Sequence, residues 1–175
     1  MHVSSGEGTA TSSGAITIRS VNAGAAGTSG YLSFSSGSSV TGNSGYIHMG
    51  TGVATAGRGG MVLISVGSGT SSVGGMVQAH AGRSTVHTGG AVVVTSGEGT
   101  ATSSGVVLIR SSNSGVAGVS GSLLFSSGTS VTGNSGRVHM GTGAATAGRG
   151  GAVVVTVGSG TSGSGCLLYT SPSPR

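Results

Sequence analysis

The chain is 175 residues long, and 39 of them are glycine, while only 5% are charged and 3% are aromatic. Its formal net charge of +5 comes from seven arginines and two glutamates, Glu7 and Glu98, with no lysine or aspartate. Arginines this dilute do not form the clustered cationic surface that nucleic acids need. No apolar run approaches the roughly 18 residues of a membrane span. The composition therefore predicts neither a nucleic-acid partner nor a membrane span.

Short apolar clusters recur along the chain, and each follows a glycine that we call the anchor of its repeat. The anchors are Gly14, Gly30, Gly45, Gly60, Gly75, Gly90, Gly105, Gly121, Gly136 and Gly151. They are spaced 15 residues apart, with one extra residue before Gly30 and before Gly121. A longer repeat of six units explains why the stretch around His48 returns around His139, 91 positions later.

Two positions of every repeat are apolar without exception. The second residue after the anchor is Ile16, Leu32, Ile47, Val62, Val77, Val92, Val107, Leu123, Val138 or Val153. The fourth is Ile18, Phe34, Met49, Ile64, Ala79, Val94, Ile109, Phe125, Met140 or Val155. Apolar residues two apart predict a short strand with one buried face.

About nine residues rich in glycine, serine, threonine and alanine separate successive strands, and they suit a tight return arc. A strand and an arc repeated in register predict an all-β fold, a single β-solenoid of about ten coils with parallel in-register strands. We expect it to span residues 1–165. An antiparallel meander and a disordered chain remain the alternatives, although the mean hydropathy of +0.30 opposes disorder.

The outward face of the expected strands carries an apolar stripe. It comprises Tyr31, Tyr46, Met61, Met76, Leu63, Val93, Leu108 and Leu124. Contiguous exposed apolar patches usually mark interfaces, so we expect this stripe to be a self-association face unless more of the same chain covers it.

A threonine column in the return arcs is the candidate ligand ladder. It comprises Thr55, Thr70, Thr85, Thr100, Thr146 and Thr161, and Val40 and Val131 interrupt it. Regular threonine ladders on short-coil solenoids are typical of ice-binding proteins. The column therefore favours an alternative function, the binding of ice or polysaccharide.

No residue set predicts catalysis, a metal site or a cofactor. His48 and His139 are expected at the surface and far apart, and the two glutamates form no Ser-His-acid arrangement. The motif Gly158–Gly163 fits G-x-G-x-x-G, but no helix former follows it, as a dinucleotide site would require. We therefore expect no enzyme activity.

Residues 166–175, CLLYTSPSPR, differ from everything before them and contain the single cysteine and both prolines. This segment resembles a translated sequencing-library adapter, which implies that it is not native. The first residues match the middle of a repeat, because Val3–Gly8 aligns with Val94–Gly99. We therefore expect the chain to be a fragment.

Residues 3–165 resemble the Gly/Ser/Thr-rich β-solenoid repeat arrays of extracellular fibres and cell-surface adhesins. This resemblance implies a non-enzymatic structural or adhesive protein, located outside the cell or on its surface. Its expected partner is a second copy, bound end to end through open coil ends or laterally through the apolar stripe. Polysaccharide or another surface is a further candidate partner.

Overall fold

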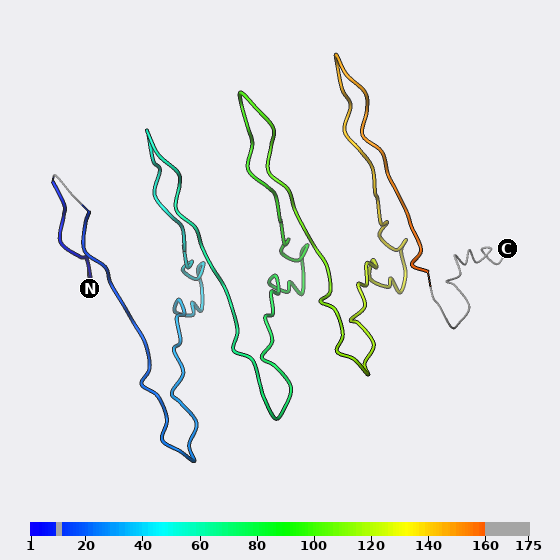
Figure 1. Cartoon of the computed structure of the whole chain (residues 1–175). Coiled ribbons are helices and arrows are strands. Elements are labelled where there is room, and N and C mark those ends of the chain that lie inside the picture. Colours follow the sequence, from blue (N-terminus) through cyan, green and yellow to red (C-terminus); the bar gives the residue numbers. More distant parts are fainter. Residues whose placement is uncertain (10–11, 160–175) are drawn as a thin grey trace. The chain divides into compact units, whose positions relative to one another are not determined.

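The computed structural model describes residues 1–9 and 12–159 of the chain. Within these ranges no residue belongs to a helix or to a β-strand. The backbone instead runs out and back in a series of narrow loops, drawn as plain tube in Figure 1. Neither the described glycines nor the other described residues adopt a positive φ, so the loops turn without left-handed backbone conformations.

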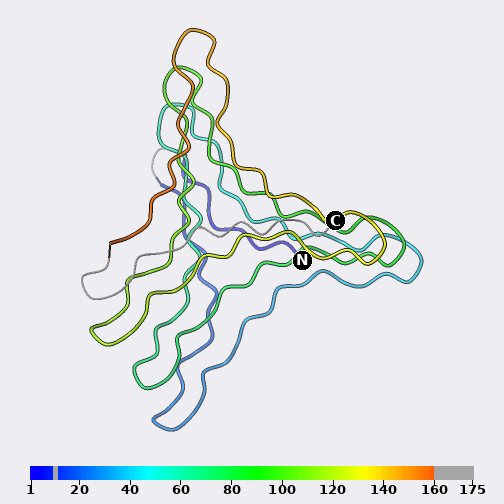
Figure 2. The same ribbon diagram turned by 90° about the vertical axis from the view of Figure 1, so that its right-hand side faces the viewer.

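Each loop reverses direction about four residues before its anchor glycine. The turns lie at residues 25–26, 40–42, 55–57, 70–72, 85–87, 100–102, 116–118, 131–133 and 146–148. Figure 2 shows the two extended arms of the loops running close together towards rounded tips. The 15-residue period of the sequence is therefore also the period of the backbone.

The loops close at their base through single backbone hydrogen bonds. In four loops an anchor amide donates to the carbonyl eight residues earlier: Gly14 to Gly6 at 3.3 Å, Gly75 to Gly67 at 3.3 Å, Gly90 to Gly82 at 2.9 Å, and Gly105 to Gly97 at 2.9 Å. Both partners of each bond belong to one repeat. The hydrogen bonds therefore hold a repeat to itself and do not join it to the next repeat.

The prediction of a β-solenoid is therefore wrong for the described residues. A solenoid needs a ladder of backbone bonds between the same strand of successive coils. The described backbone bonds instead close individual loops or span single turns. Strands that lack a paired neighbour do not form a sheet, so the antiparallel meander is not seen either. The described part of the chain is mostly coil, so the array expected over residues 1–165 is a series of loops within residues 1–9 and 12–159.

The extra residue of the two longer repeats lies within the loop. In these repeats a backbone bond closes the tip, from the Gly27 amide to the Gly24 carbonyl and from the Gly118 amide to the Gly115 carbonyl, both at 3.4 Å. A bond between residues three apart defines a β-turn. The insertion is accommodated by a tighter tip, and the anchor still closes the loop.

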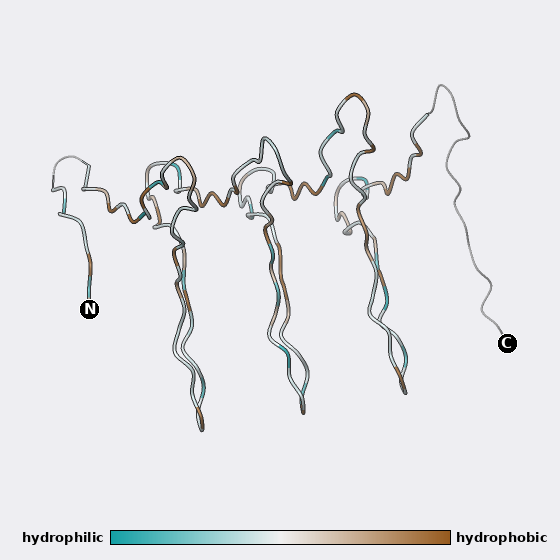
Figure 3. Cartoon of the chain, turned by 90° about the horizontal axis from the view of Figure 1, so that it is seen from below, coloured by the Kyte–Doolittle hydropathy of each residue, from teal (hydrophilic) through white to brown (hydrophobic). Residues whose placement is uncertain are grey.

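No hydrophobic core forms in the described residues, where no side chain of any kind is buried. The predicted inward positions keep about half or more of their surface: second-position side chains are 47–61% exposed, and the large fourth-position side chains are 59–74% exposed, while Val66 at the sixth position is 52% exposed. Figure 3 shows apolar stretches, in brown, recurring along the trace. The alternation of the sequence therefore leaves the second-position side chains less exposed than their outward neighbours but buries none of them.

The chain divides into two compact units, Met1–Gly90 and Ala91–Arg175. The division follows Gly90, the sixth anchor. Each unit contains the same kind of loop, and several equivalent positions of the 91-residue repeat make the same local contact. Ser39 Oγ accepts a bond from the Gly42 amide at 3.0 Å in the first unit, and Ser130 Oγ accepts one from the Gly133 amide at 3.1 Å in the second.

Candidate functional site

At the base of each loop the anchor glycine lies close to a residue nine or ten positions earlier in the chain. This residue is the sixth after the preceding anchor, and Ser5 holds the equivalent place before the first anchor, Gly14. These partners are Ser5, Ser20, Ser36, Thr51, Val66, Ala81, Ser96, Ser111, Ser127 and Thr142. A Cβ atom placed on the anchor would lie only 2.9–3.4 Å from the Cβ of its partner. A larger residue than glycine at the anchor would therefore push the arms apart.

Hydroxyl groups of these partners also bond the loop base. Ser20 and Ser36 donate from Oγ to the carbonyls of Gly30 and Gly45 at 2.8 and 2.9 Å. Thr51 and Thr142 donate from Oγ1 to the carbonyls of Gly60 and Gly151 at 3.4 and 3.2 Å. Val66 and Ala81 have no hydroxyl, and their loops are closed by backbone bonds. The loops of Ser5 and Ser96 are also closed by backbone bonds, although both residues have a hydroxyl.

The sequence analysis missed this sixth-position column, although the sequence carries its signal. All ten members are small, since each is alanine, serine, threonine or valine. Small size at a fixed distance from an anchor glycine indicates a close approach of two backbone segments. Ser5, Ser20 and Ser111 are half-buried, as their place at the loop base explains.

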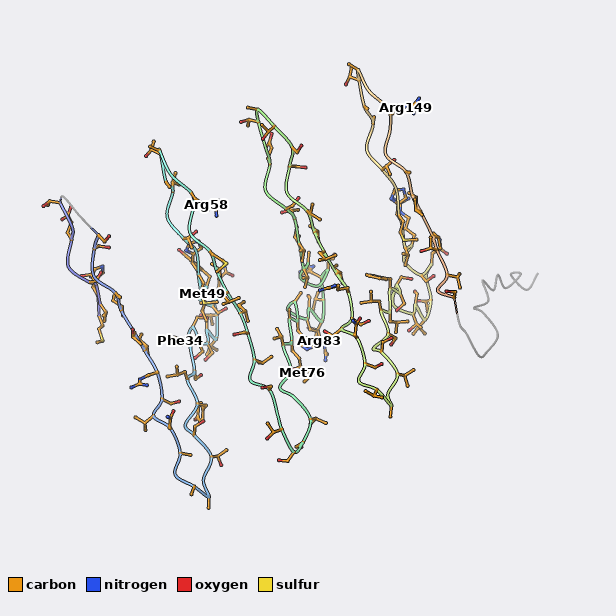
Figure 4. The ribbon with its side chains drawn as sticks, in the orientation of Figure 1. Phe34, Met49, Arg58, Met76, Arg83 and Arg149 are labelled. Carbon is orange, nitrogen blue, oxygen red and sulfur yellow. The ribbon has the colours of Figure 1, made fainter. Side chains whose placement is uncertain are left out.

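The residues of the predicted self-association face lie on the extended stretches between loops. Tyr31, Tyr46, Met61, Leu63, Met76, Val93, Leu108 and Leu124 are 71–90% exposed. Figure 4 shows the Met76 side chain standing free of the ribbon, like those of Phe34 and Met49. No strand carries these residues in the described ranges, so they do not form a sheet face, and their role in association stays a prediction.

The threonines of the predicted ligand ladder share one place in their loops. Thr55, Thr70, Thr85, Thr100 and Thr146 each occupy the first residue of a turn, while Thr161 lies outside the described residues. Val40 and Val131 hold the same turn position in the two loops where the column is interrupted. The column is thus a set of exposed loop tips, and no stacked sheet aligns it into a flat ladder.

The histidines lie beside glycines and not beside one another. The His48 ring covers Gly50, where an added Cβ would meet Cε1 at 3.1 Å, and His139 covers Gly141 with the same separation. Within residues 1–9 and 12–159, no group of three His, Cys, Asp or Glu residues could hold a metal ion. The same ranges contain no pocket.

The motif at Gly158–Gly163 and the segment 166–175 lie wholly or largely outside the described residues. Among the residues that are described, no helix is long and apolar enough to cross a membrane.

Comparisons with known proteins found no match for the chain among family models, curated proteins or solved structures. The geometry of the chain itself therefore supplies the basis for a functional proposal.

Proposed function

We propose that this chain is a non-enzymatic structural or adhesive repeat protein, outside the cell or on its surface, and that its repeats become ordered by associating with further copies. One observation carries the proposal. Every large apolar side chain of the described residues remains exposed, and even Val107 keeps 47% of its surface accessible. Because the chain does not cover its own apolar side chains, another molecule must cover them if they are to be buried.

The accessible surface gives the scale of the missing burial. The chain exposes 17,697 Å² for a mass of 16.3 kDa. A compact monomer of this mass exposes about 7,500 Å², and a fully extended chain about 24,000 Å². The single chain therefore buries about a quarter of its extended surface, where a domain of similar length buries about two thirds. Such limited burial does not offset the conformational entropy of an ordered chain.

Repetition favours another copy as the source of cover. Each copy presents the same two apolar positions at the same 15-residue interval, so a second copy matches the first at every repeat. Charge opposes this association only weakly, because the net charge of +5 is spread over 175 residues. The open coil ends and the sheet face of a solenoid are not needed for this form of association.

The concentration dependence of assembly tests the proposal. At low micromolar concentration we expect sedimentation velocity to give a monomer with coil-like far-UV circular dichroism. At about 100 µM we expect large species, a β-type spectrum and filaments or sheets in negative-stain micrographs. A chain that stays monomeric and coil-like over this range contradicts the proposal.

The binding of ice or polysaccharide through the threonine tips is the second candidate. One observation favours it: five described loops, those containing Thr55, Thr70, Thr85, Thr100 and Thr146, hold threonine at the same turn position. Inhibition of ice recrystallisation, or co-sedimentation with insoluble polysaccharide, by the monomeric chain supports this candidate. Replacement of these five threonines by valine, the residue already present at positions 40 and 131, is the matched control.

A further inference from the structure

The stretches between successive loops have free backbone groups. We call the five residues that follow an anchor its linking segment, as in residues 61–65 after Gly60. In the described part of the chain, the backbone hydrogen bonds outside helices and strands involve loop bases and turns, and none involves a residue of 61–65 or 91–95. Since the described residues contain no helix or strand, these amides and carbonyls are open to another chain.

The loops leave these segments accessible. The base of the loop at Thr51 and Gly60 is narrow, because glycine contributes no side chain where the arms meet. The loop at Gly82 and Gly90 is closed by its own backbone bond at 2.9 Å. Because each closed loop bonds only its own residues, the backbone of the linking segments stays accessible to an approaching chain.

The linking segments have the composition of β-strands. Residues 61–65 read Met-Val-Leu-Ile-Ser, and residues 91–95 and 152–156 share the sequence Ala-Val-Val-Val-Thr. All three segments are uncharged and rich in β-branched or aliphatic residues, which favours pairing of short segments between chains. Residues 106–110 are similar in composition but end in Arg110, and an arginine opposite a second arginine weakens pairing.

We propose that a second copy of this chain docks by strand addition: its linking segments pair through backbone hydrogen bonds with the linking segments of the first copy. Segments 61–65, 91–95 and 152–156 initiate the pairing, and the loops stay closed as spacers between paired segments. Pairing supplies the missing backbone partners and covers the second- and fourth-position side chains together, as in other cases of strand addition. This inference rests on the proposed function, since it specifies how the copies associate.

Proline at the third position of the linking segments tests this mechanism, because proline removes an amide donor and disfavours strand pairing. The test variant carries Leu63→Pro, Val93→Pro and Val154→Pro. The matched control is Gln78→Pro, at the same position of segment 76–80, whose fourth residue is only Ala79. We expect the triple variant to reduce the assembled mass at least fivefold at a concentration where the wild type assembles, and the control to reduce it less than twofold.

Hydrogen exchange supplies a second readout that does not depend on substitution. Amides of residues 61–65 and 91–95 should become protected on assembly of the wild-type chain, while amides of the tip 55–57 should exchange as in the monomer. If the wild type assembles, but the triple variant assembles equally and these segments gain no protection, the strand-addition mechanism is overturned and the proposed function stands. If the wild type does not assemble at all, the proposed function fails and this inference fails with it.

Discussion

Thr51 and Gly60 meet at the base of one loop in two ways. The Thr51 hydroxyl donates to the Gly60 carbonyl at 3.4 Å, and the Thr51 Cβ lies 2.9 Å from the place where Gly60 would carry a Cβ. The second distance is shorter than real Cβ contacts allow, so glycine is required at position 60 for the loop to close.

Gly60→Ala should therefore open this loop. Overpacking at a close contact costs about 1–3 kcal/mol, and the exposed arms place this site at the lower end. The expected result is loss of nuclear Overhauser contacts between residues 51 and 60. Gly59→Ala is the matched control, since a Cβ there meets nothing within 4 Å. Equal loss of contacts in both variants would show that glycine flexibility, and not the close approach, is what matters.

Thr142→Val should weaken the equivalent loop of the second unit more gently. The variant keeps the shape of the side chain but removes the Oγ1 donor to the Gly151 carbonyl, which lies 3.2 Å away. An exposed hydrogen bond contributes at most about 1 kcal/mol. The measurement is the carbonyl ¹³C shift of Gly151, which should move in Thr142→Val and stay in Thr142→Ser. An unchanged shift in the valine variant would mean that the hydroxyl bond is not populated.

Ile64→Asp should leave the free chain unchanged and impair assembly. Ile64 is 67% exposed, so a carboxylate there stays hydrated until a second copy covers it. We expect the same monomer circular dichroism and at least about a tenfold rise in the concentration needed for assembly, which corresponds to about 1.4 kcal/mol. Val131→Asp adds the same charge at a loop tip, where the side chain is 99% exposed, and should assemble nearly as the wild type does.

If both aspartate variants impair assembly to the same extent, net charge is the cause. The apolar positions of the linking segments would then have no particular part in association.

His48→Ala should be nearly neutral for both the monomer and the assembly. The ring lies over Gly50 and is exposed, and surface changes of this kind usually fall within about 0.5 kcal/mol. Assembly concentration and circular dichroism should match the wild type. A loss of assembly larger than about threefold would assign His48 a contact with the partner copy that the single chain does not reveal.

The sequence alone predicts the repeat and its anchors. The alternation that marks Val62 and Ile64 as inward does leave them less exposed than Val40 or Val131. It does not predict where the backbone bonds are made, because a nine-residue arc rich in glycine can return to its own repeat as readily as it can pass to the next. In the structure the Ser36 hydroxyl donates to the Gly45 carbonyl of the same repeat, so this arc returns to its own repeat.

The candidate surface could be predicted only as a list of residues. Tyr31 and Tyr46 are exposed, but so are nearly all described residues, and the arrangement of the tyrosines as a stripe depended on coils stacking. Stacking is a relation between repeats, and alternation within a repeat carries no information about it. The small residues of the sixth position were the better guide, since their size reports a contact that the backbone makes locally.

Loops that close within themselves have a consequence for how such an array changes over generations. Each repeat takes its closing contacts from its own 15 or 16 residues, and the β-turn at Gly24–Gly27 shows that even one inserted residue is absorbed at the tip. Gain or loss of a whole repeat by unequal recombination therefore leaves every other loop intact. A longer or shorter array then differs only in the number of loops and linking segments that it carries.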